Sequence, residues 1–150
     1  PPTDDAPKYA WDSSAGVGEK LGSTLRGVIN ASKTFLQSAD ASAGLLGLVV
    51  ETTPFYAEAG GQVADLGSIS TAAGGTFDVT DVKKVGPFVV HVGRVTSGAL
   101  AVGEAVTLSV DYSRRAPIAK NHTTTHMLNF ALKGARNARR PRRQKGTWRV

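Results

Sequence analysis

The segments FVVHVGRV, residues 88–95, and AVTLSVD, residues 105–111, decide the fold class of this chain. Apolar and polar residues alternate in both, and a period of two is typical of strands that bury one face. Residues 76–79 repeat the pattern upstream. Glycine-containing turns separate the runs, at Gly74-Gly75, Gly86-Pro87, Ser97-Gly98 and Gly103. Short strands at roughly 8–12-residue spacing with such turns predict a small antiparallel β-barrel.

Upstream of this centre the pattern is less uniform. Residues 45–50, LLGLVV, form a short apolar run bounded by turn residues, which predicts a buried strand. Residues 21–36 fit either a helix or a strand, because helical spacing of their apolar residues is offset by Gly27 and by β-branched neighbours. Residues 1–20 are rich in Pro, Asp, Ser and Gly, which favours loops.

After residue 111 the period changes to that of a helix. The segment from Arg114 to about Lys133 fits a helix with Pro117 in its first turn and Gly134 as its stop. Met127, Leu128, Ala131 and Leu132 gather on one arc of this helix, and both of its histidines lie on another.

Composition excludes several classes of protein. The 150 residues contain no cysteine, which excludes a disulfide scaffold, a cysteine zinc site and a thiol nucleophile. No apolar run is long enough for a membrane-spanning helix. The chain starts without Met or a signal-peptide pattern, and we expect its first residue to be a cut edge of a longer protein.

The net charge of +6 is unevenly distributed. Residues 133–150 hold eight of the eighteen Lys and Arg and no Asp or Glu. The first 132 residues carry ten basic against twelve acidic residues, a net charge of −2. An interaction with nucleic acid would therefore rest on the tail rather than on a basic face of the fold.

The strongest local signal is His122-Thr123-Thr124-Thr125-His126. Histidines at i and i+4 stack one helical turn apart, so both imidazoles can bind one metal ion. An ordinary pair of surface or core histidines fits the spacing equally well. A metalloprotease motif is excluded, because Thr123 stands where the general base Glu is required.

The second signal is Gly60-Gly61-Gln62. Paired glycines permit close approach of the backbone to a ligand, and the Gln62 amide offers both a donor and an acceptor. The alternative is a hairpin turn with an incidental glutamine. Factors that hydrolyse peptidyl-tRNA also use Gly-Gly-Gln, but the acidic residues Glu58 and Asp65 flank this copy, which disfavours that role near RNA phosphates.

Together these segments resemble the editing domain of eukaryotic-type alanyl-tRNA synthetases. Residues 53–67, TPFYAEAGGQVADLG, resemble the opening signature of that domain, and residues 121–132, NHTTTHMLNFAL, resemble its first zinc helix. Residues 91–93, 102–104 and 111–115 fit in order and length between them. Residues 2–9 resemble the lead-in of eukaryotic members, so the resemblance covers about residues 2–133.

The resemblance implies hydrolysis of the ester in Ser-tRNA(Ala) or Gly-tRNA(Ala). A second, hydrolytic site is the usual remedy when a pocket for alanine cannot reject glycine by size or serine by one hydroxyl. By carry-over, zinc is bound by His122 and His126, the tRNA(Ala) acceptor end contacts Gly60, Gly61 and Gln62, and the pocket is lined by Thr123 and Thr125. No residue is assigned as general base. The implied location is cytoplasmic, with an organellar pool as an addition.

The chain also departs from the family. The family completes its zinc site with a Cys-x-x-x-His segment, whereas this chain has no cysteine and, besides the pair, the single strand histidine His91, for which a local hydrogen bond is the simpler role. We therefore expect the isolated chain not to retain stoichiometric zinc. ATP and Mg would serve the ligase domain of the parent protein, and we expect that domain to lie outside this chain. Residues 134–143 are unusually Arg-rich, as either a solvated arm that contacts phosphate or the product of a disturbed reading frame.

These observations predict an α+β fold with four parts: a loop-rich lead-in over residues 1–20, a small antiparallel β-barrel over 21–112, the first helix of a truncated α/β editing subdomain over 113–133, and a disordered basic tail over 134–150. The predicted function is that of an editing fragment of alanine–tRNA ligase, inactive alone and completed by the rest of the synthetase, with no membrane partner. The alternatives are an RNA-binding module that uses the tail and a freestanding deacylase that acts in trans.

Overall fold

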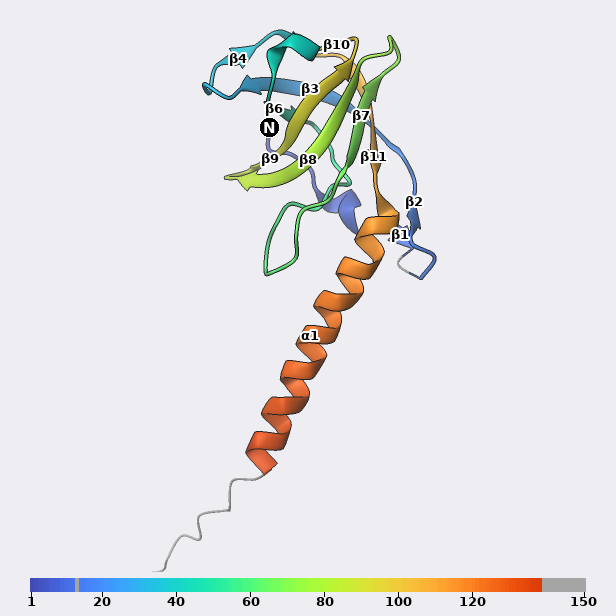
Figure 1. Ribbon diagram of the computed structural model, residues 1–150, viewed down its shortest axis with the longest axis vertical. Helices are drawn as coiled ribbons and strands as arrows, with labels where there is room; N and C mark the ends of the chain where they lie inside the picture. The colour runs from blue at the N-terminus through green and yellow to red at the C-terminus, as the bar shows by residue number, and fades with distance from the viewer. Residues whose placement is uncertain (13, 139–150) are drawn as a thin grey trace, which may run out of the picture.

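A β-barrel with one long helix projecting from it forms the computed structural model, which describes residues 1–12 and 14–138 (Figure 1). Six antiparallel strands follow one another around the barrel in the order β11-β7-β8-β9-β6-β3, and pairing of β11 with β3 closes it. Their bounds are Leu21–Asn30 for β3, Leu46–Val50 for β6, Gly67–Thr71 for β7, Thr76–Val85 for β8, Phe88–Ser97 for β9 and Ala105–Val110 for β11. The predicted barrel and α+β class are confirmed.

The ambiguous segment 21–36 is extended. It forms β3 and the short β4 (Phe35–Leu36), which pairs with β3 outside the barrel. Val28 of β3 lies opposite Leu48 of β6, and the register between these strands shifts next to Gly27. Because β3 has partners on both sides, its β-branched residues fit a strand better than an isolated helix.

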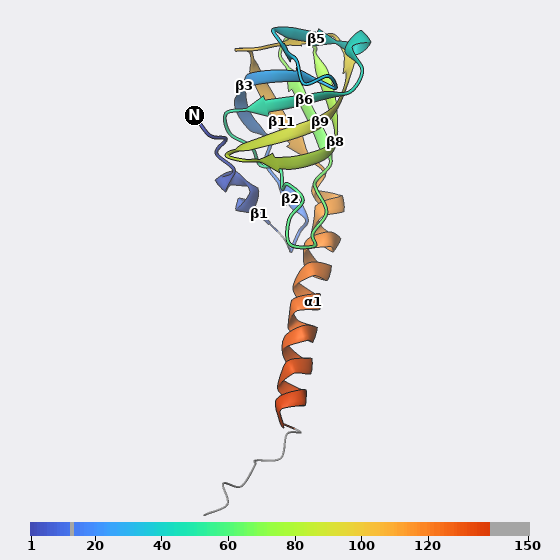
Figure 2. The same cartoon turned by 90° about the vertical axis from the view of Figure 1, so that its left-hand side faces the viewer.

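Smaller elements cover the two ends of the barrel (Figure 2). Residues 1–20, predicted to be loop-rich, contain a 3-10 turn η1 (Ala6–Tyr9) and a small hairpin of β1 (Trp11–Asp12) and β2 (Val17–Gly18). At the other end β5 (Ser38–Asp40) pairs with β10 (Ala99–Ala101), next to a second 3-10 turn η2 (Ala41–Ala43).

The core is the inside of the barrel. Strand β6 buries Leu46, Leu48 and Val50 and leaves the residues between them partly exposed. Strand β11 repeats this alternation. The buried side chains are mainly aliphatic, with Phe55 and Phe77 as the largest. Removing this apolar surface from water drives closure of the barrel, at about 25 cal/mol per Å² buried.

Gly93 marks the tightest contact between two strands. A Cβ atom at this position would lie 1.8 Å from the carbonyl oxygen of Asp78 on β8. The register between β8 and β9 shifts just beyond that contact, between Val79 and Asp81. Strand β8 is therefore bulged where it crosses β9, and only glycine fits opposite the start of the bulge.

The helix α1 (Tyr112–Ala138) begins two residues earlier than predicted. The side chain of Asp111 caps it by accepting hydrogen bonds from the Arg114 N–H at 3.1 Å and from the Ser113 hydroxyl at 2.6 Å. The Ser113 bond, followed by the Arg114 N–H, lowers the pKa of the Asp111 carboxyl. Because the helix begins at Tyr112, Pro117 lies in its second turn and not in the first, and there it removes one backbone hydrogen bond. The expected stop at Gly134 is wrong, since the helix continues to Ala138.

Over residues 112–133 of α1, the fully buried side chains are confined to the first turns. Tyr112 and Ala116 are buried, whereas residues 123–133 are all exposed. Met127, Leu128 and Leu132 are 68%, 58% and 54% exposed, so the described residues do not cover the apolar arc of this helix. No helix in the described residues has the length and apolar character needed to cross a bilayer. Residues 139–150 of the predicted basic tail lie outside the described residues.

Candidate functional site

The Gly-Gly-Gln motif lies at the tip of a hairpin, residues 54–66, here called the glycine hairpin. Gly60 and Gly61 have φ angles of 59° and 85°, the left-handed values that a type I′ turn requires at both central residues. Around them Ala59 and Gln62 exchange backbone hydrogen bonds of 3.3 and 3.0 Å. Space is open where a Cβ of either glycine would lie, so the turn conformation rather than crowding accounts for the glycines.

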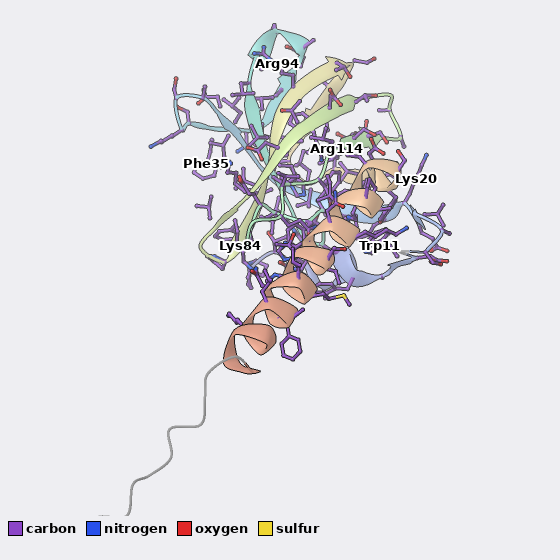
Figure 3. The ribbon with its side chains drawn as sticks, turned by 60° about the horizontal axis from the view of Figure 1, so that its bottom comes forward. Trp11, Lys20, Phe35, Lys84, Arg94 and Arg114 are labelled. Atoms are coloured by element: carbon purple, nitrogen blue, oxygen red, sulfur yellow. The ribbon has the colours of Figure 1, made fainter. Side chains whose placement is uncertain are left out.

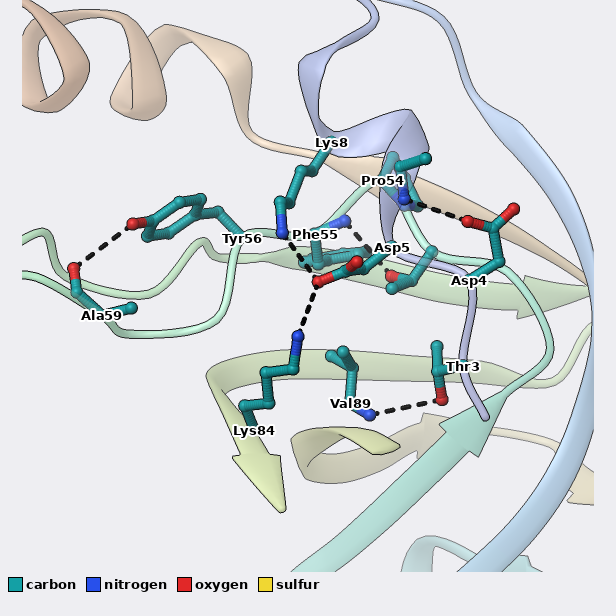
Figure 4. Close-up of polar contacts among 12 residues, drawn as sticks. Thr3, Asp4, Asp5, Lys8, Pro54, Phe55, Tyr56, Ala59, Lys84 and Val89 are labelled. Carbon is teal, nitrogen blue, oxygen red and sulfur yellow. Dashed lines mark hydrogen bonds and ion pairs between the residues drawn. The ribbon is translucent and has the colours of Figure 1, made fainter. Parts of the chain in front are cut away.

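The arms of the glycine hairpin are held near its base. Tyr56 and Asp65 face each other: the Asp65 N–H donates to the Tyr56 carbonyl at 3.1 Å, and the Tyr56 N–H donates to Asp65 Oδ2 at 2.7 Å. The Tyr56 hydroxyl also reaches the Ala59 carbonyl at 3.2 Å, as Figure 4 shows. The half-buried Gln62 side chain is therefore displayed on a hairpin braced at base and tip.

The first residues of the chain run along this region (Figure 4). Asp5 lies between the ammonium groups of Lys8 and Lys84, at 2.7 and 3.4 Å. The hydrogen bond from Lys8 is the largest influence on the carboxyl of Asp5 and lowers its pKa. Thr3 Oγ1 accepts from the Val89 N–H at 3.2 Å. These contacts connect the lead-in to strands β8 and β9.

A buried histidine anchors the start of the glycine hairpin to the barrel. Nδ1 of His91 lies 3.1 Å from the Leu48 carbonyl, which only accepts, so Nδ1 carries the proton. Nε2 then accepts from the Thr53 hydroxyl at 2.8 Å, and Thr53 Oγ1 in turn accepts from the Phe55 N–H at 3.1 Å. Burial lowers the pKa of His91 to about 4, and the bond to Leu48 opposes this only in part. His91 is thus a neutral strand histidine with local hydrogen bonds, as predicted.

Arg115, in the second turn of α1, joins three parts of the chain. Its Nε donates to both carboxylate oxygens of Asp65, at 3.1 and 2.9 Å, and its Nη2 also contacts that carboxylate. The remaining donors reach the carbonyls of Pro54 at 2.6 Å and Lys8 at 3.0 Å. Arg115 and Asp65 are each 2% exposed, so this is a buried, multiply hydrogen-bonded ion pair.

Aromatic rings enclose the same guanidinium group. Its Cζ lies 5.4 Å from the ring centroid of Trp11 and 5.0 Å from that of Tyr112, and these two rings stack on each other at 5.7 Å. Figure 3 shows Trp11 and Arg114 close to the first turns of α1. Arg114 adds a bond of 2.8 Å from Nη1 to the Ala64 carbonyl. The root of the helix is therefore fastened directly to the glycine hairpin.

Farther along α1, His122 and His126 lie next to each other one turn apart, as their spacing predicts, with their rings edge to face at 77°. Their Nε2 atoms are 3.0 Å apart, and the ring centroids are 4.5 Å apart. Thr123 and Thr125 are exposed, and their hydroxyls donate to the carbonyls four residues earlier, at 3.1 and 2.9 Å. Each keeps acceptor capacity toward a ligand, whereas its donor is used within the helix.

The imidazole pair offers two nitrogen side chains to a metal ion. In residues 1–12 and 14–138, no group of three or more His, Cys, Asp or Glu side chains is placed to hold a metal ion. A structural zinc site takes four ligands and a catalytic one at least three from the protein. The described residues therefore do not form a zinc site by themselves.

The glycine hairpin and the histidine pair lie at the same end of the barrel. In both views the hairpin extends from the end at which α1 leaves (Figures 1 and 2). Among the described residues no hydrogen bond joins Gln62 to either imidazole; the connection runs through Arg115, Asp65 and the helix backbone. The structure thus places the two motifs at one end of the barrel, and no hydrogen bond joins their side chains among the described residues.

Asp65, Thr53 and Arg115 hold this region together, and sequence reasoning assigned none of them a role. One signal was available. Basic residues in the first turns of a helix oppose its macrodipole, so Arg114-Arg115 directly after the cap indicates a specific partner for at least one of the two guanidinium groups. That partner, Asp65, is fifty residues away in sequence, and no local pattern identifies it.

Comparison with known proteins gives consistent matches. The family model described as class II (A) tRNA synthetases matches residues 10–114. A cytoplasmic alanine–tRNA ligase of Dictyostelium discoideum is 41% identical over 140 residues, 88% of this chain and 13% of that protein. The alanine–tRNA ligase of Bradyrhizobium diazoefficiens is 45% identical over 127 residues, 77% of this chain and 14% of the relative. That of Jannaschia sp. (strain CCS1) is 51% identical over 87 residues, 58% of this chain and 10% of the relative. The chain spans 10–14% of the length of these relatives.

Proposed function

Because this chain belongs to the class II (A) tRNA synthetase family, we propose that it forms part of the editing domain of an alanine–tRNA ligase. The substrates are Ser-tRNA(Ala) and Gly-tRNA(Ala), and the reaction adds water across the ester bond to release the amino acid and free tRNA. The observation that carries this proposal is the connection of the Gly60-Gly61-Gln62 turn, through Asp65 and Arg115, to the helix that bears the histidine pair.

The chemistry of the exposed groups supports this role. The Gln62 amide both donates and accepts, so it can recognise the amino group or the carbonyl oxygen of an aminoacyl ester. It is held on a turn with little freedom, which reduces the entropy lost when a flexible RNA end binds. Thr123 and Thr125 lie on the same helix as His122 and His126 and offer acceptor oxygens. None of these groups is assigned as general base.

Zinc enters the proposal as an ion that the imidazole pair shares with ligands from outside the described residues. For that reason we expect the chain to need the remainder of a synthetase for turnover, and ATP and Mg to act in the ligase part of such a protein. The partner at this site is the acceptor end of tRNA(Ala). We propose a cytoplasmic location, following the relative from D. discoideum, with subcellular fractionation to reveal any organellar pool.

The test is a chimera in which this chain replaces the matching segment of the D. discoideum enzyme. The chimera should deacylate Ser-tRNA(Ala) and spare Ala-tRNA(Ala). Gln62→Ala and His122→Ala should each abolish most of the deacylation, and Lys120→Ala, an exposed residue on the opposite face of the same helix from His122, should not. Full deacylation by both site variants would contradict the proposal.

Two other functions predict different outcomes with the chain alone. A freestanding deacylase would turn over Ser-tRNA(Ala) without any further domain. An RNA-binding module would bind tRNA without turnover, and the eight basic residues of 133–150 favour it as the second candidate. In that case the tRNA affinity measured by filter binding should fall steeply between 50 and 200 mM salt. The slope of log affinity against log salt concentration should be about proportional to the number of phosphates contacted. Removal of residues 139–150 should flatten that dependence.

A further inference from the structure

We propose that Arg115 is a positioning residue, which fixes where the glycine hairpin lies relative to the histidine pair on α1. The role rests on the proposed function, because it matters for catalysis only if Gln62 and the imidazoles act on the same substrate. The contacts themselves do not depend on that function. They follow from one buried guanidinium group that binds both ends of the hairpin and the lead-in.

The first step is that α1 has few other anchors. Between residues 117 and 133 no residue of the helix is fully buried, and residues 123–133 are exposed. The direction in which the helix leaves the barrel is therefore set by its first two turns. In those turns the polar contacts to the glycine hairpin come from Arg115, with one bond from Arg114 to Ala64.

The second step is leverage. With a rise of 1.5 Å per residue, His122 lies about 10 Å and His126 about 16 Å along the helix from Arg115. A rotation of about 10° at the root would move His126 by about 3 Å. Catalytic groups must be held to within about 0.5 Å, so an error of that size at the root removes a productive geometry.

The third step is the match between donor and acceptors. The planar guanidinium group engages the Asp65 carboxylate and two carbonyls, of Pro54 and Lys8, at the same time. A lysine at this position would keep the positive charge but present a single nitrogen, which cannot span three separated acceptors. Arg115→Lys therefore tests the planar geometry of the guanidinium group separately from its positive charge.

The chain has no cysteine, so two introduced cysteines can be spin-labelled without background. One pair, Ala59→Cys with Asn129→Cys, reports the distance from the hairpin tip to the helix. A second pair, Ala31→Cys with Ala72→Cys, lies on exposed turns of the barrel and reports its integrity. All four positions are exposed, and the distances are measured by double electron–electron resonance on the full chain.

In the parent background the tip-to-helix distance should have one narrow distribution. Arg115→Lys should at least double its width or shift its mean by 3 Å or more, while the barrel pair stays unchanged. Arg94→Lys, an exposed arginine on β9, should alter neither distance. If the parent chain already shows a broad distribution, or if Arg115→Lys leaves it narrow, the positioning role is overturned.

If Arg115→Lys fails to fold, seen as loss of the β-sheet circular dichroism signal, Asp65→Asn tests the proposal instead. This variant keeps the size of the side chain and the two carbonyl contacts of Arg115 but removes the charge at the hairpin. It should broaden the tip-to-helix distance in the same way, and an unchanged distribution would overturn the proposal.

The chimera adds a kinetic measurement. Arg115→Lys should lower kcat for deacylation by at least about 100-fold, because a misplacement of 1 Å already has about that effect and the expected displacement is larger, with little change in KM for the tRNA. An increase in KM with kcat unchanged would assign Arg115 to RNA binding and overturn the positioning role. If the parent chimera fails to deacylate at all, the proposed function fails, whereas the distance measurement still decides whether Arg115 sets the geometry.

Discussion

The hydroxyl of Thr53 donates a hydrogen bond to Nε2 of the buried His91 ring, over 2.8 Å. The ring is neutral because it is fully buried, which lowers its pKa, and its single N–H, on Nδ1, donates to the Leu48 carbonyl. A residue at the start of the glycine hairpin is thus held to the centre of the barrel by a group that must stay uncharged.

This pair predicts a specific dependence of stability on pH. Burial lowers the pKa of His91 from 6.5 to about 4, so the unfolded state binds more protons than the folded state between these values. The part of the free energy of unfolding that depends on a neutral His91 is fully present above pH 6.5 and falls as the pH drops toward 4. In total it amounts to about 3 kcal/mol. Urea unfolding of the parent and of His91→Gln between pH 4 and 7 measures it. Parallel curves for the two proteins would contradict the prediction.

Gly93 should tolerate no side chain. A Cβ atom there would lie 1.8 Å from the Asp78 carbonyl oxygen, so Gly93→Ala forces β8 and β9 apart and should lower the free energy of unfolding by about 3 kcal/mol or more. Gly22→Ala is the matched control, because nothing lies within 4 Å of a Cβ at that position of β3. Denaturant unfolding of both variants should show a large difference, and equal stabilities would refute this interpretation.

The turn at the tip of the glycine hairpin should accept asparagine but not valine at its first central position. Gly60 has a φ of 59°, which asparagine adopts readily and valine does not. Gly60→Val should lower the free energy of local opening of the turn by about 1–2 kcal/mol relative to Gly60→Asn. Hydrogen exchange at the Gln62 amide, which donates to the Ala59 carbonyl at 3.0 Å, reports that opening. Similar exchange rates in the two variants would show that the turn does not depend on left-handed backbone.

The isolated chain should not retain zinc. The described residues bring together no group of three or more side chains able to hold a metal ion, and the two imidazoles by themselves would hold zinc weakly. After dialysis, metal analysis should give well below one zinc per chain, with no difference between the parent and His122→Ala. A stoichiometric content that His122→Ala abolishes would be the contrary result.

Much of the barrel could be predicted, because its information is local. The alternation in residues 88–95 and 105–111 identifies strands by their period, and glycines mark the turns. For residues 21–36, where the helical and extended patterns compete, the pairing of β3 with both β6 and β11 decides, and those contacts are made between distant segments.

The site was predictable in its parts and not in its assembly. The i, i+4 spacing of His122 and His126 predicts that they lie next to each other, and Gly60-Gly61 predicts the turn. What joins these parts is the ion pair of Asp65 with Arg115, fifty residues apart, which no periodicity encodes. The end of α1 also differed from the prediction, since the helix continues past Gly134.

The closure of the sheet has a bearing on how this protein will behave at high concentration. Because β11 pairs with β3, the barrel strands have neighbours on both sides and offer little free main chain to a second molecule. Apolar side chains such as Phe35, Val85 and Phe88 are exposed on the barrel, whereas the helical arm exposes four within six residues, Met127, Leu128, Phe130 and Leu132. Self-association should therefore proceed through helix-to-helix contact and be reversed by mild detergent, rather than through growth of fibrils from strand edges.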